Sequence, residues 1–154
     1  RFDSTTQPII NMRLKIEINT REHFQVLGFK RIPYEVENGW FSGNCMLTCY
    51  ELEELLGTKL RALYQRRKGR DLFDLFWALE KQPVDIEKLI SCYNTYLRFS
   101  VDSPPTQKQF LINMEEKMTD TEFLHDIHSI LKSGIEFNIG EAWVIVRKNI
   151  IEKI

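Results

Sequence analysis

The stretch "LGTKLRALYQRRKGRDLFDLFWAL", residues 56–79, contains two helical patterns separated by a basic turn. From residue 52 onward, leucines recur with the 3.6-residue period of a helix that is apolar on one face. The letters "RRKG" then supply a basic last turn and a glycine stop. A second, mostly apolar pattern runs from about Asp71 to Lys81, and Pro83 ends it. The stretch therefore predicts two helices folded together by a short turn.

Three charged residues in this helical pair lie where apolar residues would pack better. Lys59 falls near the middle of the leucine arc, and Asp71 and Asp74 share the polar strip of the second helix. A lone lysine in such a stripe commonly extends its amine to water, and the acids have ordinary explanations as a first-turn residue and an ion pair. The functional alternative is that Lys59 directs its charge at an anionic ligand such as a nucleotide phosphate. In either case we expect the cation and both acids on facing helices.

The chain before this pair is rich in strand patterns, and the chain after it in helical ones. "RLKIEI", residues 13–18, alternates strictly between apolar and charged residues and predicts a half-buried strand. Two further strands are predicted over 29–37 and 45–50, on either side of a turn. Helical cores are predicted within 83–99, 103–118, 119–132 and 140–154. This order of elements predicts the α+β class.

Chain length, net charge and cysteine count limit the class of protein to which this sequence can belong. The 154 residues suffice for one domain with a core, and a net charge of −1 gives no whole-chain attraction to nucleic acid or membrane. The three cysteines lack the spacing of a zinc site and indicate free thiols in a reducing compartment. No apolar run approaches the ~20 residues of a membrane span. We therefore expect a cytoplasmic protein without a membrane partner.

The spacing of the charged residues matches a known pattern. Lys59 and Ala62 fit K-x-x-A, and Arg70, Asp71 and Asp74 fit R-D-x-x-D-L. This combination closely resembles the signature of the AbiEii/AbiGii toxin family of nucleotidyltransferases, which includes the MenA-type toxins. The segment "RLKIEI" resembles the family's strand that carries its third acidic residue, here Glu17. The resemblance spans most of the chain.

The resemblance implies an enzyme that transfers a nucleoside monophosphate from a nucleoside triphosphate (NTP) to an acceptor such as tRNA or another RNA. It also implies magnesium (Mg²⁺) as cofactor and a cognate antitoxin as partner. Residues 1–49 would be the end of a nucleotidyltransferase-type mixed sheet, and residues 50–154 a mainly helical domain. By the same resemblance Lys59, Asp71 and Asp74 would be catalytic. Lys59, Arg66 and Arg70 would bind the nucleotide, and Glu17 would bind the metal.

The sequence departs from the family's pattern in one respect. The family has a Gly-Ser type of turn followed by an acidic pair upstream of the third acid, and nothing of that kind precedes Glu17. Two explanations remain open: the chain is the C-terminal part of a longer enzyme and is inactive alone, or it is a degenerate relative. A rival function is a non-enzymatic helical interaction module whose charges only fix packing. The enzyme interpretation requires Lys59 and at least one aspartate at a common concave surface near Glu17, whereas a closed ion pair far from Glu17 would favour the interaction module.

Overall fold

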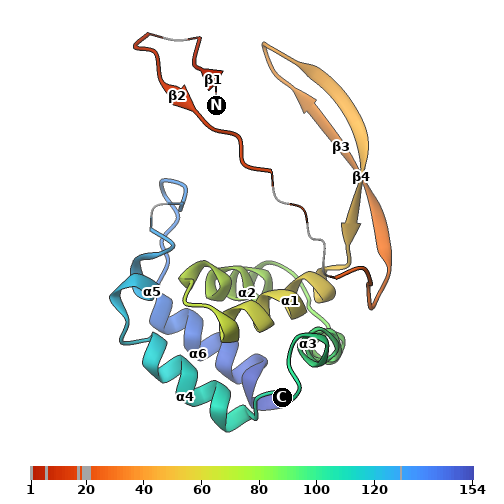
Figure 1. Ribbon diagram of the computed structural model, residues 1–154, viewed down its shortest axis with the longest axis vertical. Helices are drawn as coiled ribbons and strands as arrows, with labels where there is room; N and C mark the ends of the chain where they lie inside the picture. The colour runs from red at the N-terminus through yellow and green to blue at the C-terminus, as the bar shows by residue number, and fades with distance from the viewer. Residues whose placement is uncertain (1, 6, 17, 19–21, 129) are drawn as a thin grey trace.

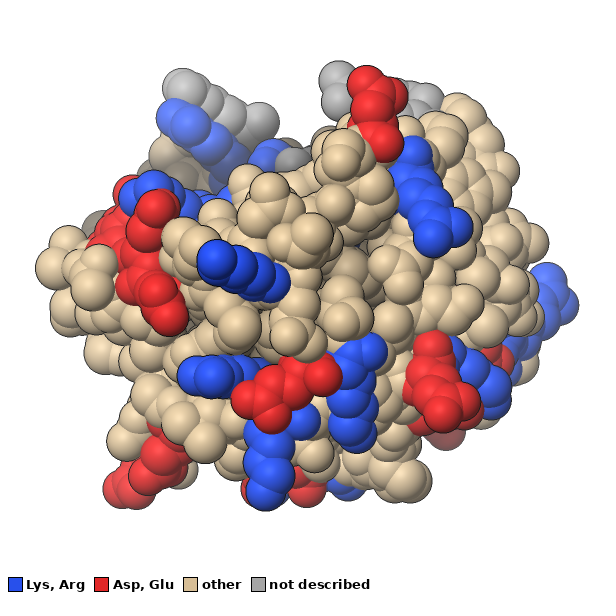
Figure 2. All heavy atoms as spheres, turned by 90° about the horizontal axis from the view of Figure 1, so that it is seen from below, with Lys and Arg blue, Asp and Glu red and all other residues tan. Residues whose placement is uncertain are grey.

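The computed structural model describes residues 2–5, 7–16, 18, 22–128 and 130–154. Six α-helices form a body from which two pairs of strands project (Figure 1). The predicted α+β class is confirmed, with strands early in the chain and helices after them. Among the described residues, no helix has the length and apolar character needed to cross a membrane. On the face shown in Figure 2, basic and acidic side chains are interspersed, in keeping with the near-zero net charge.

The helical body is built around the predicted pair. The helices are α1 Leu52–Gln65, α2 Gly69–Lys81, α3 Ile86–Ser100, α4 Gln107–Lys117, α5 Thr121–His125 and α6 Ile139–Asn149, followed by the 3₁₀ turn η1 Ile151–Lys153. Several begin at side-chain caps, including the capping box of Thr106 with Gln109 before α4 and the Asn138 cap of α6. Within the leucine arc of α1, Leu56, Leu60 and Leu63 are buried against the other helices, whereas Leu55 is 44% exposed. The helix expected within 119–132 is confirmed only for its first part, α5.

The strands form two separate antiparallel pairs. The larger is the hairpin of β3 Phe29–Glu37 and β4 Ser42–Tyr50, which confirms both predicted strands and starts the second one at Ser42. Its turn is closed by the Asn38 side chain, which accepts hydrogen bonds from the N–H groups of Trp40 and Phe41. The smaller pair is β1 Phe2–Asp3 with β2 Asn11–Met12. The described residues therefore do not form the mixed sheet that the resemblance implies.

The strand predicted over residues 13–18 is wrong for every residue of it that the structure describes. Residues 13–16 and 18 have no strand assignment, and Glu17 lies outside the described residues. The face expected to be half-buried is open, with Leu14, Ile16 and Ile18 between 74% and 79% exposed. A strand needs a neighbour for its backbone hydrogen bonds, and period-two alternation shows a suitable sequence but not the presence of that neighbour.

Helices α1 and α3 approach each other closely at Gly57. A Cβ atom added at Gly57 of α1 would lie 2.8 Å from Cys92 Cβ and 2.9 Å from the Tyr93 backbone nitrogen of α3. Both distances are shorter than real Cβ contacts, and one of the atoms belongs to a helix backbone that cannot move alone. Gly57 is therefore required for the close approach of these two helices.

We expect Gly57→Ala to lower the free energy of unfolding by about 1–3 kcal/mol, the usual cost of overpacking. The matched control is Gly39→Ala in the turn of the β3–β4 hairpin, where no atom lies within 4 Å of the added Cβ. Urea unfolding followed by circular dichroism measures both changes. Equal stability of the two variants would contradict the proposed contact between α1 and α3.

Candidate functional site

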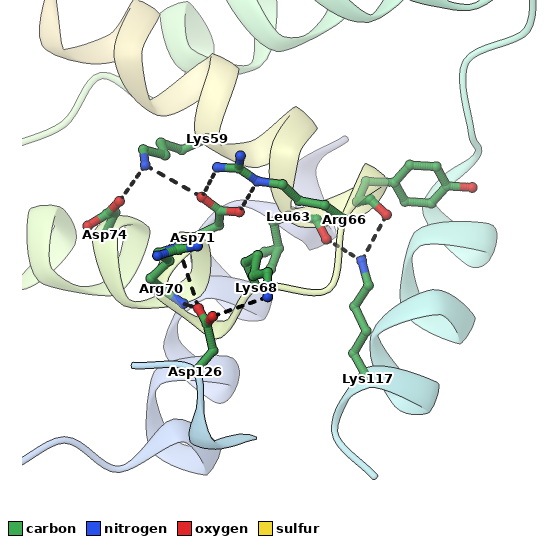
Figure 3. Close-up of polar contacts among 10 residues, drawn as sticks. Lys59, Leu63, Arg66, Lys68, Arg70, Asp71, Asp74, Lys117 and Asp126 are labelled. Carbon is green, nitrogen blue, oxygen red and sulfur yellow. Dashed lines mark hydrogen bonds and ion pairs between the residues drawn. The ribbon is translucent and has the colours of Figure 1, made fainter. Parts of the chain in front are cut away.

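Asp71 is the buried centre of the site. It lies in the first turn of α2 and has no exposed side-chain surface. Arg66, at the end of α1, donates to both carboxylate oxygens, with Nε 2.7 Å and Nη2 2.8 Å away (Figure 3). This two-point contact raises the pKa of Arg66 above its ordinary value. The pair therefore acts as a clamp that links the end of α1 to the start of α2. Its Asp71 carboxylate is buried, and its Arg66 guanidinium is half-exposed.

Lys59 joins this clamp to a second, looser pair. Its amine lies 3.5 Å from Asp71 Oδ1 and 2.7 Å from Asp74 Oδ2. The expected arrangement of one cation and two acids on facing helices is therefore confirmed (Figure 3). The two acids differ sharply in depth, because the Asp74 side chain is 40% exposed whereas Asp71 is fully buried. Lys59 itself is 36% exposed, so its contact with Asp74 is an exposed ion pair.

The other cations of the basic turn contact α5 and the residues that flank it. Arg70 directs its guanidinium at Asp126, with Nε 3.6 Å from Oδ2, and its backbone N–H donates to the same carboxylate. Lys68 also contacts Asp126, and Arg67 pairs with Asp120 at 2.9 Å. Arg70, which the resemblance assigns to nucleotide binding, is thus paired with Asp126. The charge of this turn helps to attach α5.

A hollow of about 290 Å³ opens along the exposed side of α1. Lys59 and Arg66 line it, and so do Arg61 from the same helix and Tyr50 from the end of β4. Asp71 and Asp74 are not part of its lining. The hollow gives Lys59 a concave surface, but neither aspartate lines it, so this part of the requirement of the enzyme interpretation is not met. The position of Glu17 relative to the hollow lies outside the described residues.

One wall of the hollow is held by a buried carboxylate that sequence analysis missed. Glu54, fully buried in α1, accepts hydrogen bonds from the N–H groups of Val26 and Leu27 at 2.7 and 2.8 Å and from the Tyr96 hydroxyl at 2.7 Å. We call these four residues the Glu54 anchor. Burial and the Glu54 acceptor raise the pKa of Tyr96. One feature of the sequence could have indicated this buried position: Gly57 lies three residues after Glu54 on the same helix face, and a glycine there is typical of close packing.

The anchor fixes the chain segment that completes the wall. Beside it, Phe24 stacks on Tyr96 with ring centroids 4.9 Å apart. The Arg61 guanidinium lies over the Tyr96 ring, 5.4 Å from the ring centre, and Arg61 also forms an ion pair with Glu22. A segment remote in sequence is therefore held against α1 and α3 by both polar and aromatic contacts.

Lys117 of α4 is a second buried charge that sequence analysis missed. Its amine donates to the backbone carbonyls of Leu63 and Tyr64, the latter at 2.8 Å, and so satisfies the carbonyl end of α1 (Figure 3). Burial lowers the pKa of Lys117 to about 8. The signal in the sequence was a lysine that follows Phe110 and Met114 on one helix face, the same pattern as Lys59 among leucines.

The described residues do not fit a magnesium site. No group of three or more histidine, cysteine or acidic side chains comes together among them. The oxygens of Asp71 are taken by Arg66 and Lys59, and Asp74 contacts Lys59. Magnesium prefers several oxygen ligands, which these two engaged carboxylates do not supply. Glu17, the predicted metal ligand, lies outside the described residues.

Comparison with known proteins identifies one family. A family model described as "Nucleotidyl transferase AbiEii toxin, Type IV TA system" matches residues 1–141, which is most of the chain. No curated protein and no solved structure matches. The matched range includes Lys59, Arg66, Asp71 and Asp74, together with the hollow along α1.

The different depths of the two acids predict different effects on stability. We expect Asp71→Asn to lower the free energy of unfolding by about 1.5–3 kcal/mol, because it removes the charged acceptor of a buried hydrogen-bonded pair. Asp74→Asn should cost less than about 1 kcal/mol, as is usual for an exposed ion pair. Urea unfolding of both variants at pH 7 measures the difference. If the two changes had equal effects, Asp71 would not be the clamp described above.

The lowered pKa of Lys117 predicts a pH dependence of stability. Between about pH 8 and the ordinary lysine value of 10.5, the unfolded chain binds the proton that folded Lys117 has lost, so stability rises with pH. Urea unfolding from pH 7 to 9.5 should show this rise in the unmodified chain relative to Lys117→Met. Below pH 8 the difference between the two proteins should be constant. Parallel curves over the whole range would contradict a pKa near 8.

Proposed function

The chain belongs to the AbiEii family of nucleotidyl transferase toxins of type IV toxin–antitoxin systems, and on this premise we propose that its α1 face binds the phosphates of a nucleoside triphosphate at Lys59. The complete protein would transfer a nucleoside monophosphate to an RNA acceptor such as tRNA. Its partner would be a cognate antitoxin, a proposal that the type IV toxin–antitoxin family supports. The cytoplasm, where NTP and RNA are abundant, is the compartment that suits this reaction.

The observation that carries the proposal is the exposed ion pair of Lys59 with Asp74 at the rim of the hollow. Exposed pairs contribute only about 0–1 kcal/mol, so Lys59 can exchange Asp74 for a phosphate at little cost. A phosphate offers more negative charge and several acceptor oxygens in return. Arg66 stays locked to Asp71, and its half-exposed guanidinium remains as a fixed positive group beside the phosphate.

The same exchange gives the two acids different roles. Once a phosphate occupies Lys59, the Asp74 carboxylate loses its partner and becomes free to accept a proton from an acceptor hydroxyl. The acceptor oxygen then forms a bond to the α-phosphorus, the bond from that phosphorus to the β-phosphate oxygen breaks, and pyrophosphate leaves. Asp71 keeps its contacts with Arg66 and positions α1 relative to α2. This assignment makes Asp74 the general base and Asp71 the positioning residue.

The charge balance of the cluster favours one rival function. Lys59 and Arg66 are matched by Asp71 and Asp74, so the cluster is neutral and internally paired. A non-enzymatic interaction module needs nothing more from these residues than packing. In that case NTP would not bind, and the ion pair of Lys59 with Asp74 would remain closed.

We expect the chain to bind NTP, and Lys59→Met to weaken binding about 10- to 150-fold, the equivalent of one charged hydrogen bond. Lys88→Met is the matched control, because Lys88 is an exposed lysine on α3 that pairs with Asp85. Titration calorimetry with each NTP, with and without magnesium, measures the affinities, and thermal melting checks that folding is intact. Equal affinity in the chain and in Lys59→Met would refute the phosphate site.

The reaction itself is tested on the complete protein with α-labelled NTP and total RNA. Lys59→Met and Asp74→Asn should each reduce labelling of the RNA by about 10²–10⁴-fold, the range for lost positioning or acid–base groups. Lys88→Met should label RNA as the unmodified protein does. Full labelling by Asp74→Asn would exclude the proposed role of Asp74 as the proton acceptor.

A further inference from the structure

The hollow along α1 has two chemically different ends. Positive charge runs along α1 from Lys59 through Arg61 to Arg66, and the Glu22 carboxylate in the same lining pairs with Arg61. At the other end lie Tyr50, an aromatic ring, and Leu55, an apolar side chain in the first half of α1. Along the helix, Lys59 lies about 6 Å and Arg66 about 16 Å beyond Leu55, so the positive charge begins one turn from the aromatic end. The hollow therefore suits an elongated ligand with a charged end and a flat, apolar end.

Its size agrees with a small ligand. The volume of about 290 Å³ lies near the lower end of the ~300–1,000 Å³ range of small-molecule sites. Between the two ends, Thr58 and Ala62 line the helix side of the hollow with small side chains. A larger residue at either position would divide the hollow, whereas these leave it continuous from the aromatic end to the charged end.

Tyr50 is held in place before any ligand arrives. It is the last residue of β4 and lies directly opposite Phe29 in the hairpin register. The two rings pack with their centroids 5.0 Å apart and tilted by 51°. Because Tyr50 is half-buried and supported by this neighbour, stacking on it requires little loss of side-chain freedom.

The geometry points to Tyr50 as the surface on which the nucleobase stacks, while the phosphates of the same nucleotide lie at Lys59 and Arg66. This assignment rests on the proposed phosphate site and extends it to the whole nucleotide. Every base has a flat π-face, so stacking holds a base without selecting among the four. Tyr50 therefore contributes affinity for a nucleoside as a class, and the four NTPs bind with similar strength.

The test compares NTP with inorganic tripolyphosphate, which has the charge but no base. Titration calorimetry on the chain should give tighter binding of NTP by about 5- to 150-fold, the equivalent of one stacked base. Tyr50→Ala and Tyr50→Leu should abolish this difference, and neither should change the affinity for tripolyphosphate. Tyr50→Phe should keep the difference, and so should Tyr34→Ala, the control, because Tyr34 is an exposed tyrosine of the same hairpin.

The outcomes separate this inference from the proposal on which it rests. If NTP and tripolyphosphate bind equally and Lys59→Met weakens both, the phosphate site stands and the stacking role of Tyr50 is refuted. If Tyr50→Ala weakens both ligands to the same degree, Tyr50 only supports the fold of the hollow, and the stacking role is again refuted. If neither ligand binds, both proposals fail together.

Discussion

Asp71 places a negative charge where no solvent reaches it, and the way the chain neutralises that charge governs how α1 and α2 meet. A buried carboxylate without partners is strongly unfavourable, so the fold must bring cations to it. Arg66 supplies two hydrogen bonds from the end of α1, and Lys59 approaches from about two turns earlier in the same helix. The turn between the helices can therefore close in only one way that satisfies the acid. Lys59 and Arg66, the two cations that neutralise Asp71, are also charged residues that line the hollow beside α1.

The remaining charges of the turn serve a different purpose. Arg67, Lys68 and Arg70 each have an acidic partner in or beside α5, so their charge is used within the fold. By contrast, the Lys59 contact with Asp74 is exposed on both sides and easily exchanged. A run of basic residues that looks uniform in the sequence is thus divided by the fold into fixed and exchangeable charges. An exchangeable charge can pair directly with a ligand, whereas a fixed charge contributes a constant positive field beside it.

Helical periodicity was a reliable guide to the fold. The leucine arc of α1 and the Pro83 stop of α2 define the helical pair without outside information, because both depend on local geometry. The alternation in residues 13–18 failed as a guide because a strand depends on a partner that no local pattern encodes. Period alone also placed Asp71 and Asp74 on one side, as the structure confirms, but it could not give their depths. Depth depends on which residues cover each acid, and here that cover comes from α1.

The Glu54 anchor attaches the chain before β3 to the helical body through two adjacent backbone N–H groups. On one side of this attachment lies the N-terminal segment, and on the other side the β3–β4 hairpin, both projecting from the helices (Figure 1). The anchor is therefore the point at which both projecting segments are attached to the helical body. The same Tyr96 that bonds to Glu54 lies under Arg61 in the wall of the hollow, so the attachment of both projecting segments and the shape of that wall depend on one side chain. The hairpin also reaches the hollow directly, because Tyr50 at the end of β4 lines it.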